Sequence, residues 1–169
     1  NMLKNGEKTI GVTALFGTEK YDQGDIICQK SASVEYPIKI ADAINVIANL
    51  YADLAHYVFT RELDVLVSLS QKQKHDDATY SLWLDYDDYI IDWSASSLTI
   101  KRFIDSVGYP FLGARTFLDD SEIIIDDAQI FDDVYIENRT CGKILLFDEE
   151  RPIVVCRKGL LKICVARIK

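Results

Sequence analysis

The sequence has 169 residues, of which 49% are hydrophobic and 27% are charged, a composition that predicts a globular protein with one sizeable core or a partial domain and a small second module. Its formal net charge of −8 argues against a nucleic acid as partner, because contacts to phosphates need clustered lysine and arginine. No apolar run is long enough to cross a bilayer and no signal segment opens the sequence, so we expect a cytoplasmic protein without membrane contact.

The first recognisable elements are two short apolar runs, Val12–Phe16 and Ile26–Cys28, whose length predicts strands. The loop between them contains Asp22, followed two residues later by Gly24, which predicts a turn that holds a carboxylate at the strand end. A plain hairpin in which this aspartate only shapes an Asx turn explains the same pattern.

A long amphipathic helix is predicted at Lys39–Leu63, because apolar residues recur there at helical spacing. Its apolar stripe should pack on the sheet that begins with Val12–Phe16. The polar segment Ser68–Asp77 has no periodicity and is predicted to be a surface linker; His75 lies in it, and we assign this histidine no role.

A second helix is predicted at Ser97–Gly108, capped by Ser96 or Ser97 and stopped by Gly108 with Pro110. Trp93, before the cap, is predicted to be a packing residue. The remainder has short β-rich runs separated by turn signals, which predict a small sandwich or barrel. These runs are residues 115–118, 123–125, 128–136, 143–147, 153–157 and 160–165.

The four cysteines, Cys28, Cys141, Cys156 and Cys164, show no metal-ligand spacing. They form no C-x-x-C pair and have no histidine at ligand intervals, so we expect reduced thiols, with neither a metal site nor a disulfide framework.

The stretch Gly11–Gln29, with its sequence GVT followed by YDQGDII, resembles the signature of the folate-dependent formyltransferases, which include methionyl-tRNA formyltransferases and sugar N-formyltransferases. Downstream landmarks agree with that family in order and spacing over nearly the whole chain. They are Ala78–Tyr80, Ile91–Trp93, Gly108–Pro110, Gly113–Ala114 and Gly142.

The resemblance implies an α/β plus β fold. Residues 1–67 would be the C-terminal portion of the family's Rossmann-like catalytic domain, and residues 68–112 a linker with a connecting helix. Residues 113–169 would form a small open β-barrel module of the oligonucleotide-binding (OB-like) type.

The family's active site combines an asparagine, a histidine and an aspartate, and it takes its formyl group from 10-formyltetrahydrofolate. Asp22 matches the catalytic aspartate, while Glu19, Tyr21 and Asp22 are the implied contacts to the pterin. Asp25 is expected only to cap the turn. The family's Asn-x-His segment does not precede Gly11, so we expect that the chain begins partway through the catalytic domain and is inactive alone.

The acceptor site is indicated by aromatic residues. In methionyl-tRNA formyltransferases the corresponding stretch resembles Thr-Tyr-Ala-x-Lys-x-x-Lys-Glu. Trp83 and Tyr86 stand at the positions of its two lysines. Aromatic rings suit a planar base or a sugar better than phosphate. Trp83 could equally be a core residue at a domain interface.

We therefore predict a sugar N-formyltransferase that acts on the amino group of a nucleotide-linked aminodeoxy sugar, in the assembly of a surface polysaccharide such as lipopolysaccharide O-antigen. The alternatives are a methionyl-tRNA formyltransferase and a non-catalytic binding or assembly module. A homodimer is also expected, because a truncated α/β layer would leave Val12–Phe16 with an unpaired edge and an exposed apolar face.

Overall fold

The computed structural model describes the backbone of residues 1–169 and every side chain except that of His75, which therefore lies outside the described side chains. The chain forms two compact units. The hairpin unit comprises Glu7–Glu35 and Asp42–Leu82, and the C-terminal unit comprises Asn1–Gly6, Tyr36–Ala41 and Trp83–Lys169.

The hairpin unit is built on two antiparallel strands, β1 (Thr9–Leu15) and β2 (Ile26–Ser33). Both predicted strands are confirmed, and both are longer than predicted because β1 pairs with β2 from Thr9 opposite Ser33 to the loop. The expected exposed apolar face is not found: Val12 is buried, and residues 14–16 are half-buried.

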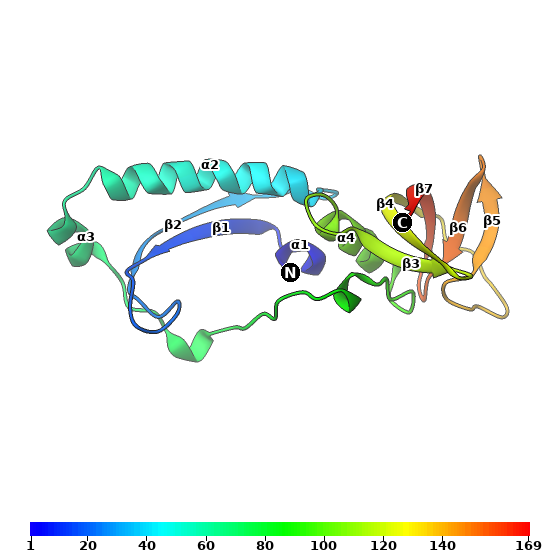
Figure 1. The fold of residues 1–169 in the computed structure, drawn as a ribbon, viewed down its shortest axis with the longest axis horizontal. Coiled ribbons are helices and arrows are strands. Elements are labelled where there is room, and N and C mark those ends of the chain that lie inside the picture. Colours follow the sequence, from blue (N-terminus) through cyan, green and yellow to red (C-terminus); the bar gives the residue numbers. More distant parts are fainter. The chain divides into compact units, whose positions relative to one another are not determined.

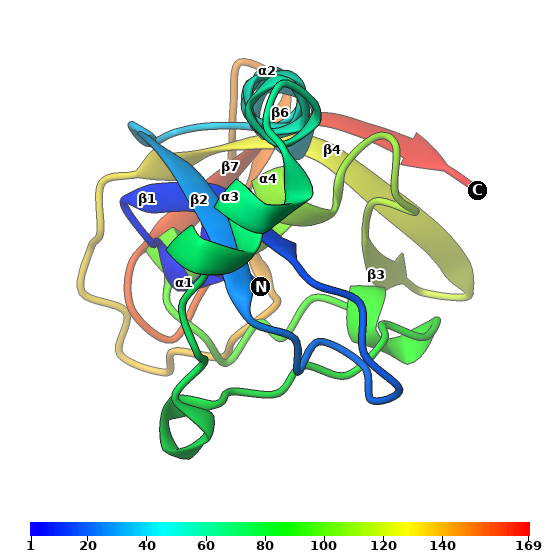
Figure 2. The ribbon, with the colours of Figure 1, turned by 90° about the vertical axis from the view of Figure 1, so that its left-hand side faces the viewer.

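Helix α2 (Ile40–Phe59) runs alongside this hairpin from Asp42 onward, as Figures 1 and 2 show. The prediction that it reaches Leu63 is wrong. Its last carbonyls are capped earlier, because the Thr60 hydroxyl donates to the His56 oxygen at 2.7 Å and the Arg61 guanidinium donates to the Tyr57 oxygen at 2.8 Å.

A separate short helix, α3 (Leu63–Leu69), follows and buries Leu66. This helix was not predicted from the sequence, because its seven residues are too few to show a clear helical period. A 3-10 turn at His75–Asp77 lies in the predicted linker.

The C-terminal unit contains a five-stranded antiparallel sheet in the order β3-β4-β7-β6-β5. Its strands are β3 (Ala114–Leu118), β4 (Ser121–Phe131), β5 (Ile144–Asp148), β6 (Arg151–Val155) and β7 (Leu160–Ile168). Strands β3 and β5 are edges, so the sheet is open.

Strand β4 corrects one sequence prediction. The acidic pair Asp126–Asp127, predicted to be a turn between two strands, is instead an irregularity within one continuous strand. Arg167 pairs with the first carboxylate at 2.9 Å, and Lys39 pairs with the second at 2.9 Å. Each of the two adjacent carboxylates in the strand thus has a cation beside it.

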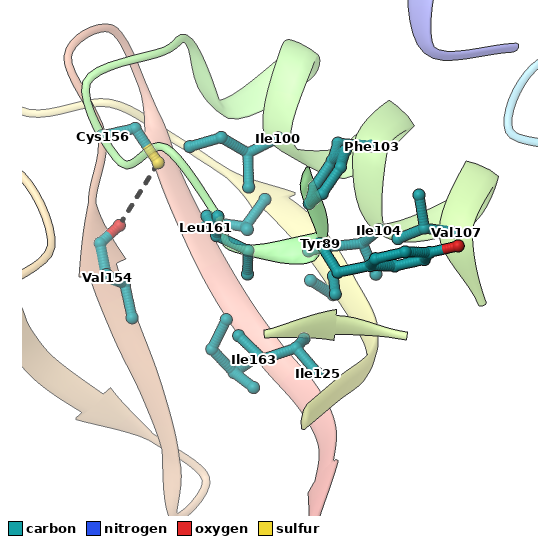
Figure 3. Packing of buried hydrophobic residues seen from close by; sticks show 13 residues of the cluster. Tyr89, Ile100, Phe103, Ile104, Val107, Ile125, Val154, Cys156, Leu161 and Ile163 are labelled. Atoms are coloured by element: carbon teal, nitrogen blue, oxygen red, sulfur yellow. Dashed lines mark hydrogen bonds between the residues drawn. The ribbon is translucent and has the colours of Figure 1, made fainter. Parts of the chain in front are cut away.

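Helix α4 (Ser97–Val107) covers the sheet, and the short helix α1 (Met2–Asn5) lies beside it. Ser96 is the N-cap of α4, as predicted, and its side chain accepts a hydrogen bond from the Thr99 amide at 3.1 Å. Figure 3 shows one face of α4 meeting strand side chains in the main core. Its labelled members include Ile100, Phe103, Ile104 and Val107 on the helix, and Ile125, Leu161 and Ile163 on the sheet.

One further prediction is confirmed in this core. Trp93 packs against it, and its indole nitrogen donates to the Thr116 hydroxyl at 2.9 Å. The described cysteines are all free, and the thiol of Cys156 contacts the Val154 oxygen in Figure 3. Burial raises the pKa of the Cys156 thiol to about 12, so this cysteine is inert at neutral pH.

Candidate active site

The loop between β1 and β2 is closed at its base by a backbone hydrogen bond, which the Phe16 amide donates to the Asp25 oxygen at 3.0 Å. Gly24 lies against this closure: a Cβ added to it would fall 1.7 Å from the Phe16 oxygen. No larger residue fits there without a shift of the backbone. A Cβ at Gly17 would meet nothing within 4 Å, so only the second glycine shapes the loop sterically.

Asp22 stands on this loop in the left-handed conformation, with φ of 54°. Aspartate and asparagine are among the few residues that adopt this conformation readily. Its side chain is exposed, and no described group forms a hydrogen bond or ion pair with its carboxylate. The loop therefore fixes the main chain and leaves the carboxylate available to another partner.

Gln73 attaches the loop to a segment distant in sequence. Its amide nitrogen donates to the Asp22 oxygen at 2.7 Å and to the Gly24 oxygen at 2.7 Å. Next to it, the backbones of Gln71 and Ile26 exchange two hydrogen bonds, of 2.7 and 2.9 Å. The role of Gln73 was not predicted from the sequence, because a glutamine in a polar segment without periodicity carries no distinguishing pattern.

The other predicted pterin contacts lie on the same loop. Glu19 is exposed, and 97% of the Tyr21 side chain is accessible to solvent. No contact joins either residue to the carboxylate of Asp22 among the described side chains. The structure thus places all three on one loop without bonding them together, and their contact with a pterin stays a prediction.

The two predicted acceptor residues belong to the C-terminal unit and have different surroundings. The Trp83 side chain is 99% exposed, so it is not a core residue of its unit. Tyr86 is 43% exposed and precedes a 3-10 turn at Asp87–Tyr89. The described residues show no contact between the two rings.

Tyr86 is held by charged residues. Its hydroxyl donates to the Glu122 carboxylate at 2.6 Å and accepts from the Lys169 ammonium at 2.7 Å. The guanidinium of Arg115, which is buried, lies 3.7 Å from the centre of the Tyr86 ring. One face of the ring is therefore occupied by a cation, a feature that the sequence alone did not indicate.

These contacts also shift the pKa values of Glu122 and Lys169. The Tyr86 hydroxyl holds the pKa of the Glu122 carboxyl below its usual value, with smaller contributions from Lys169 and Arg115. The same hydroxyl, followed by Glu122, raises the pKa of Lys169. At neutral pH Glu122 is therefore negatively charged and Lys169 positively charged, and their hydrogen bonds keep Tyr86 in place.

Within the described side chains, no three His, Cys, Asp or Glu residues gather in a way that could hold a metal ion. The described helices also include none whose length and apolar character would let it span a bilayer.

The fold and the loop define a mixed α/β protein with open sheets, and residues 84–169, just over half of the chain, match the family model "Formyl transferase, C-terminal domain". The chain belongs to the folate-dependent formyltransferase family, which confirms the resemblance seen in its sequence.

The similar curated proteins include an ArnA protein and methionyl-tRNA formyltransferases. The chain is 32% identical over 173 residues to the bifunctional polymyxin resistance protein ArnA of Wigglesworthia glossinidia brevipalpis, covering 98% of this chain and 24% of that protein. It is 27% identical to the methionyl-tRNA formyltransferase of Caldanaerobacter subterraneus subsp. tengcongensis, covering 94% of this chain and 50% of that protein. The chain thus spans half or less of these relatives.

Solved structures share the fold. HypX from Aquifex aeolicus in complex with tetrahydrofolic acid aligns with a TM-score of 0.67 at 16% identity, over 99% of this chain and 29% of that one. The N-formyltransferase from Helicobacter canadensis, in complex with folinic acid and dTDP-3-aminofucose, aligns with a TM-score of 0.62 at 17% identity, over 98% of this chain and 59% of that one.

Proposed function

We propose that the full-length protein carrying this sequence is a sugar N-formyltransferase. It would transfer a formyl group from 10-formyltetrahydrofolate, the donor that its family uses, to the amino group of a nucleotide-linked aminodeoxy sugar. The observation that carries the proposal is the loop of Asp22, whose main chain is held from two sides while its carboxylate is left without a partner among the described residues.

Formyl transfer to an amine requires two kinds of assistance. The amine loses a proton as it attacks, and the oxygen of the tetrahedral intermediate needs hydrogen-bond donors. In this proposal Asp22 assists removal of the proton, and the donors correspond to the family's asparagine and histidine.

The same loop offers a fit for the formyl donor. Gln73 already occupies the main-chain oxygens of Asp22 and Gly24. The remaining backbone groups of Glu19, Tyr21 and Asp22, on a loop exposed to solvent, are available to a bound pterin. We propose these three as its contacts.

The acceptor class follows from Trp83 and the overall charge. A fully exposed indole offers a stacking surface to the base of a nucleotide sugar, worth about 1–3 kcal/mol for a stacked base. The net charge of −8 disfavours a tRNA acceptor. Tyr86, whose ring has Arg115 at 3.7 Å and the Lys169 ammonium at 4.7 Å from its centre, would contribute the ring surface that these two cations leave uncovered.

Methionyl-tRNA formyltransferase is the second candidate. Curated relatives with that name match this chain at 26–30% identity, for example those of Caldanaerobacter subterraneus and Borrelia hermsii. A non-catalytic binding or assembly module is the third, and it would show no transfer to any acceptor.

The test is an acceptor panel. The full-length protein is incubated with 10-formyltetrahydrofolate and either nucleotide-linked amino sugars or methionyl-tRNA, and formylated product is measured. We expect turnover with at least one sugar, and loss of apparent affinity for it in Trp83→Ala but not in Tyr135→Ala, a control at another exposed ring of the same unit. Turnover with methionyl-tRNA alone would overturn the proposal.

The finer architecture belongs to the same proposal. We place residues 1–67 in a Rossmann-like catalytic domain, residues 68–112 in a connecting segment, and residues 113–169 in an OB-like open barrel. The open order of five antiparallel strands supports the barrel. A role in O-antigen assembly and a cytoplasmic location stay predictions.

We also propose a homodimer. Its support is the edge of β1 that β2 leaves unpaired in the two-stranded sheet, since such edges tend to be covered. Sedimentation of the full-length protein checks this, and a monomer throughout the micromolar range would contradict it.

A further inference from the structure

We infer that Gln73 is a positioning residue for Asp22: its two hydrogen bonds hold the main chain on both sides of Gln23 and thereby aim the Asp22 carboxylate. The inference rests on the proposed function, because it assigns a task to the loop in catalysis. Gln73 itself would touch neither the donor nor the acceptor.

The chemistry of a primary amide explains why a glutamine stands here. Its nitrogen carries two N–H groups, and each donates to one carbonyl oxygen of the loop at 2.7 Å. A carboxylate offers no donor, and an apolar side chain of equal length offers none either. The amide therefore bridges two carbonyls without adding charge beside the carboxylate of Asp22.

The backbone brings Gln73 into reach. The pair of hydrogen bonds between Gln71 and Ile26 fixes the segment where β2 begins, and Gln73 follows two residues later. Gln73 is half-buried, whereas the side chain of Gln71 is exposed and forms no hydrogen bond with a described residue. Only one of the two glutamines uses its side chain to hold the loop.

The loop needs this support because little else fixes its tip. The Phe16–Asp25 bond closes its base, and the Thr18 hydroxyl bonds the Lys20 oxygen at 2.7 Å. Asp22 is in the left-handed conformation, which aspartate tolerates but adopts less readily than glycine does. Without Gln73, the tip would sample several conformations, and the carboxylate would face the reacting amine for only part of the time.

The first test compares Gln73→Met, which removes both donors at similar length, with Gln73→Glu, which also places a charge beside two carbonyl oxygens. The full-length protein is assayed with its sugar acceptor. We expect kcat to fall roughly tenfold or more in both variants, the scale of one or two lost hydrogen bonds. The acceptor KM should change little, because Gln73 itself would not touch the acceptor. Gln71→Glu is the matched control, and its kcat should stay within about twofold of wild type.

A double-mutant cycle separates positioning from general loss of structure. If Gln73 acts through the Asp22 carboxylate, Gln73→Met should cost little further activity in an Asp22→Asn background, because residues that act as a unit are not additive. A full, independent loss in that background, or wild-type kcat in Gln73→Met, would overturn the inference.

A measurement that does not need activity completes the test. Lys20 lies exposed on the loop, so trypsin cleavage after it, followed by mass spectrometry, reports how often the loop opens. We expect cleavage roughly tenfold faster in Gln73→Met than in Gln71→Glu. Equal rates would show that Gln73 does not hold the loop. If the wild-type protein forms no formylated product, the proposed function fails and so does the catalytic part of the inference, while cleavage still decides whether Gln73 orders the loop.

Discussion

Asp22 and Gly24 stand two residues apart on one loop, and each meets a different requirement of the backbone. Asp22 occupies a left-handed conformation that aspartate tolerates, and Gly24 occupies a space that no Cβ can enter. The geometry of the loop therefore depends on both, whereas the proposed chemistry depends only on the carboxylate.

Replacing Asp22 by Asn separates the role of its backbone conformation from the role of its carboxylate. Asparagine adopts the same left-handed angles, so we expect Asp22→Asn in the full-length protein to leave the melting temperature and folate binding nearly unchanged. Turnover should fall by about a hundredfold or more, the scale of a general acid–base group. Steady-state kinetics provide the measurement. Near-normal turnover would assign Asp22 to turn formation alone.

Gly24→Ala tests the backbone instead. Its Cβ would lie 1.7 Å from the Phe16 oxygen, so the loop must shift, and we expect a loss of roughly 1–3 kcal/mol in the free energy of unfolding. Gly17→Ala is the matched control and should be neutral, since its Cβ meets nothing. Urea denaturation of both variants checks this, and equal stability would mean that the loop relaxes without cost.

At the scale of elements, α4 shows how local and tertiary signals can agree. The Ser96 cap defines its start, and the apolar face that follows is the face that the sheet buries. In α2 the signals disagree, because the apolar periodicity continues beyond Phe59, where side-chain capping by Thr60 and Arg61 ends the helix.

The contribution of the Ser96 cap of α4 to the free energy of unfolding can be measured. Ser96→Ala removes the acceptor of the Thr99 amide and should lower the free energy of unfolding by about 1 kcal/mol. Ser121→Ala, at an exposed serine whose side chain forms no hydrogen bond with a described residue, should change it by less than about 0.5 kcal/mol. Thermal denaturation followed by circular dichroism compares the two. Equal losses would show that the cap is not specific.

At the scale of the whole molecule, the C-terminal unit is tied together by a charge network between segments far apart in sequence. Lys39 pairs with Asp127 at 2.9 Å and with Asp105 at 3.4 Å, and Lys101 pairs with Asp105 at 2.6 Å. Burial alone would raise the pKa of Asp127 and lower that of Lys39, but their hydrogen bond and attraction reverse both effects. The pKa of Asp127 is therefore lowered and that of Lys39 is raised.

The pH dependence of stability follows from these directions. A lowered carboxyl pKa stabilises the fold above the unfolded value of about 4, and this contribution is lost as the pH falls through the folded pKa. A raised lysine pKa stabilises the fold below about 10.5, and this contribution is lost as the pH rises through the folded pKa. We expect a melting temperature that is highest between about pH 5 and pH 10 and decreases on both sides.

The variant Asp127→Asn tests whether the Asp127 carboxylate causes the decrease of the melting temperature at low pH. This variant should lower the melting temperature at pH 7 and flatten its decrease between about pH 5 and pH 2, because the charge of Asp127 is already absent. Asp132→Asn, at an exposed aspartate without an ion pair among the described residues, should keep the wild-type profile. Parallel profiles for all three proteins would exclude the network as the cause.

The sequence by itself determined the features that depend on neighbouring residues. The hairpin with Asp22 on its loop, the serine cap and apolar face of α4, and the resemblance to the formyltransferases were all accessible from local patterns. Strand length, helical periodicity and turn residues act over a few positions, so a single sequence displays them directly.

Only the tertiary structure decided the features that join distant segments. Gln73 reaches the Asp22 oxygen across 51 positions, and Lys169 reaches the Tyr86 hydroxyl across 83. The two aspartates within β4 likewise pair with Lys39 and Arg167 from elsewhere in the chain. A hydrogen bond or an ion pair depends on where its two partners lie in space, and folding alone brings these pairs within bonding distance.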